Sequence, residues 1–158
     1  MTQKNNTNNL TETILYNMES TARIAKARAH RLFEEDYEFG ITFNEYVILD
    51  NLYTHPKIHQ RDLAKLLFKG TANLSRDLDK LEQRGLIKRD IDIRAKRIVK
   101  TLVLTPDGEN ICQKASKKAM EDISEIESIF TKNEQQTFIS LISKLRNRLV
   151  QEDKMFFE

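Results

Sequence analysis

Residues 61–105 constrain the fold of this chain more than any other stretch. They read as a short helix, a turn that contains Gly70, a longer helix with a polar start, a stop at Gly85 and two β-type runs. Leucines recur at spacings of three and four in both helical parts, and the β-type runs are rich in Ile, Val and Thr. This order of elements predicts a helix-turn-helix followed by a β-hairpin, an arrangement that can place one helix in a DNA groove.

The charges of the chain are unevenly distributed. The formal net charge is only +2, from 26 Lys and Arg against 24 Asp and Glu. Residues 57–100, however, hold thirteen Lys and Arg against six Asp and Glu, a local charge of +7, and the remainder carries −5. A basic region on an acidic remainder favours a phosphate-bearing partner such as nucleic acid, and a solvated basic surface is the alternative interpretation.

Other features exclude several classes of protein. Cys112 is the single cysteine, which excludes an intrachain disulfide framework and a cysteine-based zinc site. The first residues lack the apolar segment of a secretory signal, and no apolar run has the length of a membrane span. We therefore expect a cytoplasmic protein without a membrane partner, and no cofactor is indicated.

Helical periodicity flanks the central stretch on both sides. We expect a flexible arm over residues 1–10, a helical region over 11–38, a winged helix-turn-helix over 41–105 and further helices over 106–158. We call the winged helix-turn-helix over residues 41–105 the head. The apolar stripes of the two flanking helical regions are longer than the head can cover. They predict a homodimer in which both regions form the dimerisation body, with a monomeric helical bundle as the alternative.

Local signals mark where several of these helices begin and end. Gly85 suits a left-handed cap at the end of the longer helix, and Pro56 prevents continuation of the helix that begins near Phe43. Thr105 and Pro106 together form a strong helix start, with Thr as the N-cap and Pro at the first helical position.

The start of the longer helix carries side chains that can read bases. Helix-turn-helix proteins place this part of the second helix against base edges, while the preceding helix crosses the DNA backbone. Arg can bond guanine and Asn adenine through two hydrogen bonds each, and an Ala or Thr methyl can touch thymine. We favour Arg76 for a base edge and Gln60 and Arg61 for phosphates. The predicted DNA contacts of the two helices are Gln60, Arg61, Thr71, Ala72, Asn73, Ser75, Arg76 and Lys80.

Three runs of sequence are characteristic of a known family: LSRDLDKLEQRGLIKR (Leu74–Arg89), DIRAKRI (Asp92–Ile98) and LTPDG (Leu104–Gly108). Through them the chain resembles, from about Thr11 to Lys154, the MarR/SlyA family of winged-helix transcriptional regulators. The resemblance implies a mainly α fold with a small β-hairpin wing, in an intertwined homodimer built by the N- and C-terminal helices. It also implies a sequence-specific regulator of double-stranded DNA that binds a pseudo-palindromic operator. Such proteins are most often repressors released by a small phenolic or lipophilic ligand or by cysteine oxidation.

The hairpin carries the family's Asp-x-Arg pair at Asp92 and Arg94, in which the Asp orients the Arg into the minor groove. The spacing departs from the family, because only two residues separate Arg89 from Asp92 and the return strand is longer. A turn nearer residues 95–96 would make Arg97 a competitor for the tip, although the motif favours Arg94. The predicted wing contacts are Asp92, Arg94, Lys96 and Arg97.

An effector site is marked less clearly. Cys112 lies at the start of the long helix, where a small core residue is the favoured interpretation and redox control the alternative. A ligand pocket between the helical body and the head is one hypothesis, and ordinary core packing of the same side chains is the other. The candidate lining residues are Tyr16, His30, Phe33, Phe39 and Tyr46.

No pattern of catalytic or metal-binding residues emerges. His55 and His59 are four residues apart, but Pro56 between them disfavours the helix that would align them. The scattered glycines form no phosphate loop, so we expect neither an enzyme nor a metal site. The sequence therefore predicts a dimeric DNA-binding regulator. The alternative is a winged-helix module that binds another protein and has no specific DNA affinity.

Overall fold

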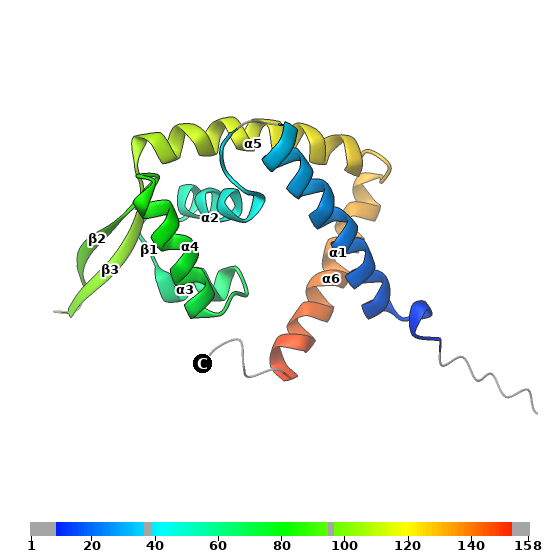
Figure 1. The fold of residues 1–158 in the computed structure, drawn as a ribbon. Helices are drawn as coiled ribbons and strands as arrows, with labels where there is room; N and C mark the ends of the chain where they lie inside the picture. Colours follow the sequence, from blue (N-terminus) through cyan, green and yellow to red (C-terminus); the bar gives the residue numbers. More distant parts are fainter. Residues whose placement is uncertain (1–8, 37–38, 95–96, 153–158) are drawn as a thin grey trace, which may run out of the picture. The chain divides into compact units, whose positions relative to one another are not determined.

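The computed structural model describes residues 9–36, 39–94 and 97–152 (Figure 1). The protein is mostly helical with one small antiparallel sheet, which confirms the predicted fold class. The chain divides into two compact units, Met1–Phe43 and Asn44–Glu158. No helix within the described ranges has the length and hydropathy needed to cross a membrane.

The first unit consists of one long helix with a short helix before it. Asn9 caps a 3₁₀ helix, η1 (Leu10–Glu12), so the last part of the predicted arm is structured, while residues 1–8 lie outside the described residues. Thr13 then caps α1 (Ile14–Arg31) by accepting a hydrogen bond from a backbone amide, and a π-helical turn, η2 (Leu32–Asp36), follows. The predicted helix is confirmed, but α1 buries none of its own residues.

The second unit holds the other helices and the sheet. The predicted helices are confirmed, and one short strand, β1, was not predicted from the sequence. The elements are α2 (Phe43–Thr54), β1 (Ile58–His59), α3 (Gln60–Leu66), α4 (Thr71–Gln83), β2 (Ile87–Arg94), β3 (Arg97–Leu104), α5 (Pro106–Glu127) and α6 (Lys132–Glu152).

A leucine-rich core holds α2, α3 and α4 together. The leucines that recur every three or four residues on α4 point to one side of the helix and are completely buried, as is Leu63 of α3, whereas Leu66 of α3 is 42% exposed. Removal of this apolar surface from water is the main stabilising contribution to the head. The fully buried large side chains of the three helices are Ile48, Leu49, Leu52, Leu63, Leu74, Leu78 and Leu81.

The turn between α3 and α4 differs from expectation in one detail. Its left-handed residue is Phe68, with φ of 50°, whereas Gly70 has an ordinary φ of −61° and serves as the N-cap of α4. The backbone amide of Lys69 donates to the carbonyl of Ala64 at 2.9 Å, which closes the end of α3 and requires the preceding residue to turn left-handed. The turn is where the sequence predicted it, but glycine does not supply its unusual conformation.

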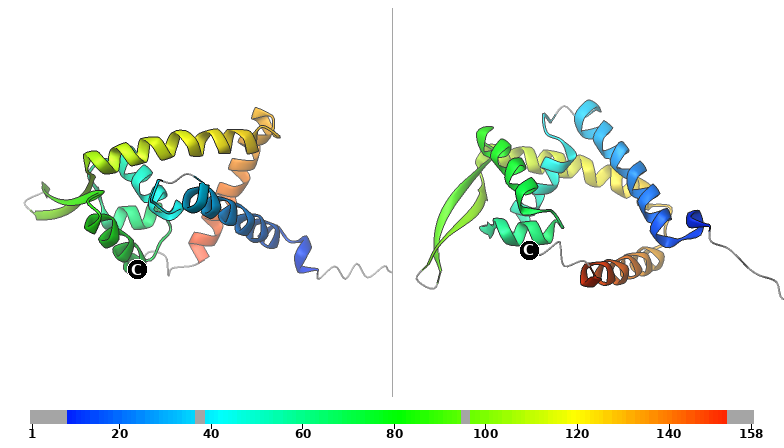
Figure 2. Two further views of the ribbon diagram at one scale, coloured as in Figure 1. Left: turned by 45° about the horizontal axis from the view of Figure 1, so that its top comes forward. Right: turned by 60° about the horizontal axis from the view of Figure 1, so that its bottom comes forward.

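The sheet has the strand order β1-β3-β2, and all pairs are antiparallel. β2 and β3 pair continuously from Ile87 opposite Leu104 to Arg94 opposite Arg97. They extend as one long hairpin away from the helices of the head, as both views in Figure 2 show. The charged residues that precede Arg94 and follow Arg97 are therefore part of regular strands.

Two glycines fix the junction between α4 and α5. Gly85 has φ of 71° and ends α4 as predicted. The Thr105 hydroxyl donates to the Gly85 carbonyl at 2.6 Å and accepts from the Gly108 amide at 3.1 Å, and the Thr105 amide donates to the Leu86 carbonyl at 3.1 Å. A Cβ on Gly108 would overlap the carbonyl oxygen of Leu86, so the glycine in LTPDG permits this close approach.

The two ends of α5 differ in burial. Cys112, Ala115 and Ala119 are buried, whereas the apolar residues beyond Ala119 are exposed. α5 ends at Glu127, and Phe130, which lies beyond it, stacks on Phe138 of α6 with ring centroids 6.1 Å apart.

Candidate nucleic-acid interface

The N-terminal half of α4 presents a polar surface beside the head's core. Because its three leucines are buried on one side, the residues between them face outward. The predicted base-reading residues Thr71, Ala72, Asn73 and Arg76 are exposed, together with Lys80; Ser75 is only half-buried rather than fully exposed. A helix start that is exposed and polar, on a helix anchored by leucines, has the form of a recognition helix.

The preceding helix and turn lie against α4. Arg61 at the start of α3 is exposed, and Gln60 is half-buried. Lys69 in the turn pairs with Asp77 of α4, with 2.9 Å between Nζ and Oδ2. This ion pair holds the turn against the recognition helix, and it directs Lys69 toward a carboxylate within the head.

The hairpin ends at the two arginines that competed for its tip. Arg94 is the last residue of β2, Arg97 is the first of β3, and the two are directly paired. The hairpin therefore turns between them, at the place that the strand lengths indicated. Asp92 pairs with Val99 two positions before. Lys96 lies outside the described residues, as do the side chains of Asp92, Arg94 and Arg97.

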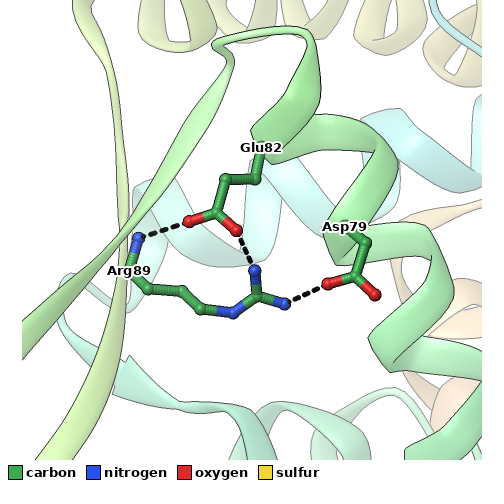
Figure 3. Close-up of polar contacts among 3 residues, drawn as sticks. All are labelled: Asp79, Glu82 and Arg89. Carbon is green, nitrogen blue, oxygen red and sulfur yellow. Dashed lines mark hydrogen bonds and ion pairs between the residues drawn. The ribbon is translucent and has the colours of Figure 1, made fainter.

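One arginine joins the hairpin to the recognition helix. Arg89 of β2 donates from Nη2 to Asp79 Oδ1 at 2.6 Å and from Nη1 to Glu82 Oε2, and its backbone amide donates to Glu82 Oε1 at 3.2 Å (Figure 3). In the sequence, Arg89 is only one of the thirteen Lys and Arg of residues 57–100. Two acids three apart on α4, followed by an arginine at the third residue of the next strand, were the available signal.

The predicted ligand-pocket residues have different surroundings. Tyr16 and His30 are exposed on α1, and His30 Nε2 lies 3.1 Å from Glu34 Oε2. Phe33 is buried, and its ring centroid lies 6.3 Å from that of Phe39. Tyr46 is buried in the second unit. None of the five lines the hollow of about 450 Å³ in that unit, whose walls are Leu52, Tyr53, Pro56, Val103, Leu104 and Glu109.

The single cysteine is a core residue, as the sequence favoured. Cys112 is 1% exposed, and burial raises its pKa to about 11, with the negative charges of Asp50 and Glu109 adding to the effect. Burial also raises the pKa of Tyr46, against the opposing effect of a hydrogen bond with Ser116. Because the thiolate is the reactive form of cysteine, Cys112 is unsuited to sensing oxidants at neutral pH.

The described residues contain no group of three or more His, Cys, Asp or Glu side chains that could hold a metal ion. His55 lies just after α2, where its Nδ1 is 3.2 Å from the carbonyl oxygen of Asn51. His59 is the N-cap residue of α3. The two histidines therefore belong to different local structures.

The geometry of the head agrees with comparisons to known proteins. The model of the MarR family matches residues 39–98, which span α2, α3, α4 and the hairpin up to the start of β3. The central part of the chain therefore matches the MarR family. Among curated relatives, the HTH-type transcriptional regulator YybA of Bacillus subtilis is 26% identical over 112 residues, 71% of this chain and 74% of YybA.

Solved structures of MarR proteins resemble most of the chain. The MepR–DNA complex of Staphylococcus aureus superposes with a TM-score of 0.77 at 25% identity, covering 87% of this chain and 96% of MepR. A MarR/EmrR regulator of Acinetobacter sp. ADP1 gives a TM-score of 0.79 at 23% identity, covering 87% of this chain and 94% of the other. The MarR family and these structural neighbours are transcriptional regulators and not enzymes.

Proposed function

We propose that this protein is a homodimeric MarR-type transcriptional repressor that binds a pseudo-palindromic operator in double-stranded DNA. The observation that carries the proposal is the exposed, polar start of α4 on a leucine-anchored helix next to a long hairpin. MepR, a structural neighbour of the same family, has been crystallised with DNA. In the proposed complex, Arg76 and Asn73 reach base edges in the major groove, and Gln60 and Arg61 at the start of α3 contact phosphates.

The hairpin is proposed to enter the adjacent minor groove. Arg94 and Arg97 are paired at its end, and like charges directly opposite each other are unfavourable unless an anion lies nearby. A narrow minor groove supplies such a negative potential and attracts arginine. In this proposal Asp92 orients Arg94 as in the family motif, and Arg97 and Lys96 add contacts to the flanking phosphates.

A second copy of the chain is proposed to cover the exposed apolar side chains of the terminal helices. Ile14 and Ile24 on α1 are 71% and 73% exposed, and Ile139 on α6 is 64% exposed. Exposed apolar surface of this extent marks an interaction site. A two-fold dimer would present two recognition helices, which suits half-sites about one helical turn apart.

Release by a small phenolic or lipophilic effector is proposed from the family resemblance. The candidates remain Tyr16, His30, Phe33, Phe39 and Tyr46, of which Phe33 and Phe39 are in ring contact. Protection of these side chains from chemical modification in the presence of salicylate, used as a phenolic probe, would support the effector site. Unchanged modification together with unchanged DNA affinity would argue against it.

The deciding experiment is an electrophoretic shift of DNA from upstream of the protein's own gene over a series of salt concentrations. We expect a specific complex whose affinity falls steeply with salt, because Lys and Arg on phosphates release counterions. A scrambled duplex of the same length is the control. Equal affinity for both duplexes, or no shift at low salt, would favour the rival function, a protein-binding winged-helix module.

Replacement of Arg94 by Ala should weaken operator binding by about 1–3 kcal/mol and leave the folded dimer intact, because the wing contacts DNA only at its end. Fluorescence anisotropy with a labelled operator measures the affinity, and circular dichroism together with light scattering checks fold and mass. The same measurement on Arg97→Ala compares the two residues at the tip. An unchanged operator titration for Arg94→Ala would remove the proposed role of the wing motif.

Replacement of Arg76 by Ala should relax base preference as well as affinity, because two hydrogen bonds to guanine discriminate by about 1–3 kcal/mol. Selection of bound duplexes from a random pool, before and after the change, measures the preference. Loss of affinity by the same factor on every duplex would instead make Arg76 a phosphate contact.

A further inference from the structure

The three bonds of Arg89 all cross from the hairpin to the recognition helix. We call Arg89, Asp79 and Glu82 the Arg89 cluster. Asp79 and Glu82 are three residues apart on α4 and therefore lie on one side of it, and the guanidinium group reaches both carboxylates (Figure 3). The Arg89 side chain is only 24% exposed, and that of Glu82 is 37% exposed, so solvent screens these bonds less than it screens a free surface pair.

The geometry of the cluster requires arginine. Two guanidinium nitrogens bond two separate carboxylates at once, whereas the compact ammonium group of lysine cannot reproduce this fork. β2 is an edge strand, since the sheet order is β1-β3-β2. The backbone amide of Arg89 donates to Glu82 at 3.2 Å, so the helix also satisfies an amide of that edge.

The cluster changes the charge pattern next to the proposed DNA surface. Two carboxylates neutralise the guanidinium group, so Arg89 is unsuited to bind phosphate although it belongs to the basic region. Asp79 is 53% exposed and follows Arg76 by three residues on α4. Without its cationic partner, this carboxylate would repel the phosphates that the neighbouring cations attract.

We propose that Arg89 is a positioning residue that fixes the angle of the wing against the recognition helix, so that both enter their grooves on one DNA site. The inference rests on the proposed DNA-binding function. Arg94 lies five residues beyond Arg89 in β2, a lever of about 17 Å at about 3.3 Å per residue. A pivot of the strand at the Arg89 cluster is therefore amplified at the tip, where about 1 Å decides whether a hydrogen bond forms.

A double-mutant cycle tests the coupling between Arg89 and the wing tip. The probe is a fluorescent duplex that the wild-type dimer has selected from a random pool, and the variants are Arg89→Gln, Arg94→Ala and the double change. In the wild-type background we expect Arg94→Ala to weaken binding about tenfold. In the Arg89→Gln background we expect it to weaken binding less than about twofold, because the wing is already displaced.

Two matched variants separate positioning from charge. Arg84→Gln is the control, because it removes a neighbouring arginine that pairs with Glu45 at 3.0 Å within the head. Its loss of DNA affinity should be independent of the loss caused by Arg94→Ala, so the two factors should multiply in the double variant. Arg89→Lys keeps the positive charge without the fork. We expect it to behave like Arg89→Gln if Arg89 positions the wing, and like the wild type if the charge alone acts on phosphate.

Hydroxyl-radical footprinting gives a readout that a loss of general stability would not produce. For Arg89→Gln we expect protection by the wing to disappear while protection by the recognition helix remains. Asp79→Asn, at a half-exposed position, replaces Arg89→Gln if that variant does not fold. Three outcomes would each overturn the proposal. The first is that the losses of affinity caused by Arg89→Gln and Arg94→Ala multiply in the double variant, and the second is that Arg89→Lys binds DNA like the wild type. The third is that the wing of Arg89→Gln still protects the DNA from hydroxyl radicals. Failure of the wild type to select any duplex would instead remove the proposed function itself.

Discussion

The head and the terminal helices are built from similar apolar residues, but a single chain buries only one of the two sets. Leu63, Leu74 and Leu78 in the head are 0% exposed, whereas Ile24 of α1 and Ile139 of α6 are 73% and 64% exposed. The head completes its core with three short helices and a sheet. The terminal helices present long stripes for which one chain offers no cover. The difference teaches that the head completes its core within one chain, and that the exposed stripes of the flanking helices are the surface on which the proposed dimer depends.

The largest loss of stability is expected from a substitution where the head joins the C-terminal helices. Gly108→Ala places a methyl group against the carbonyl of Leu86 and should lower the free energy of unfolding by about 3 kcal/mol, because backbone must move to relieve the overlap. Urea denaturation followed by circular dichroism measures it. Gly70→Ala is the control, since nothing lies near its Cβ position and its φ is −61°, so it should cost less than about 1 kcal/mol. Equal effects would show that the junction tolerates change and would weaken the view of two coupled regions.

A smaller effect is expected on assembly. Ile139→Glu puts a charge on the exposed stripe of α6 and should weaken the proposed dimer by about 2 kcal/mol, about thirtyfold in its dissociation constant. Sedimentation over a range of concentrations measures the change. The matched control is Leu66→Glu on α3, an apolar residue that is 42% exposed in the head. A monomeric wild type, or equal weakening by both changes, would break the proposed contrast between head and terminal helices.

The smallest effect concerns pH. The pKa of Cys112 is raised from 9.0 to about 11, so the folded chain holds its thiol proton to higher pH than the unfolded chain. The stability that this group contributes is complete below about pH 9 and is lost as the pH rises through about 11. Cys112→Ala should therefore reduce the fall in unfolding free energy over that window, as urea titrations at several pH values would measure.

Alkylation gives an independent check of the same thiol. At pH 8 a pKa of about 11 leaves about one thiolate in a thousand, so iodoacetamide should modify native Cys112 far more slowly than the chain in urea. Ile126→Cys, on the second half of α5, supplies an exposed thiol whose alkylation rate can be compared with that of Cys112. That position is 45% exposed in the single chain, and a dimer that covers it would slow its alkylation. Rapid alkylation of Cys112 in the native protein would contradict its place in the core.

Much of the fold was predictable because it depends on local rules. The leucine spacing of α4, the left-handed Gly85 and the Thr105–Pro106 start each appear in the structure as the sequence indicated. The predicted outward face of α4 was likewise a consequence of helical periodicity, apart from the half-buried Ser75. Strand β1 could not be predicted from the sequence, because a two-residue strand has no periodicity of its own and forms only when β3 pairs with it.

The sequence by itself determined the order of elements, the buried side of each head helix and the basic character of the reading region. The physical reason is that periodicity, caps and charge act within a few residues of each other. Only the tertiary structure decided that β2 and β3 pair up to Arg94 and Arg97, that Gly108 meets the carbonyl of Leu86, and that Arg89 joins wing to helix. These contacts join different elements of the fold, so the pattern within one helix or strand does not reveal them. Arg89 is one of thirteen basic residues in its region, and its role becomes visible only when Asp79 and Glu82 lie beside it.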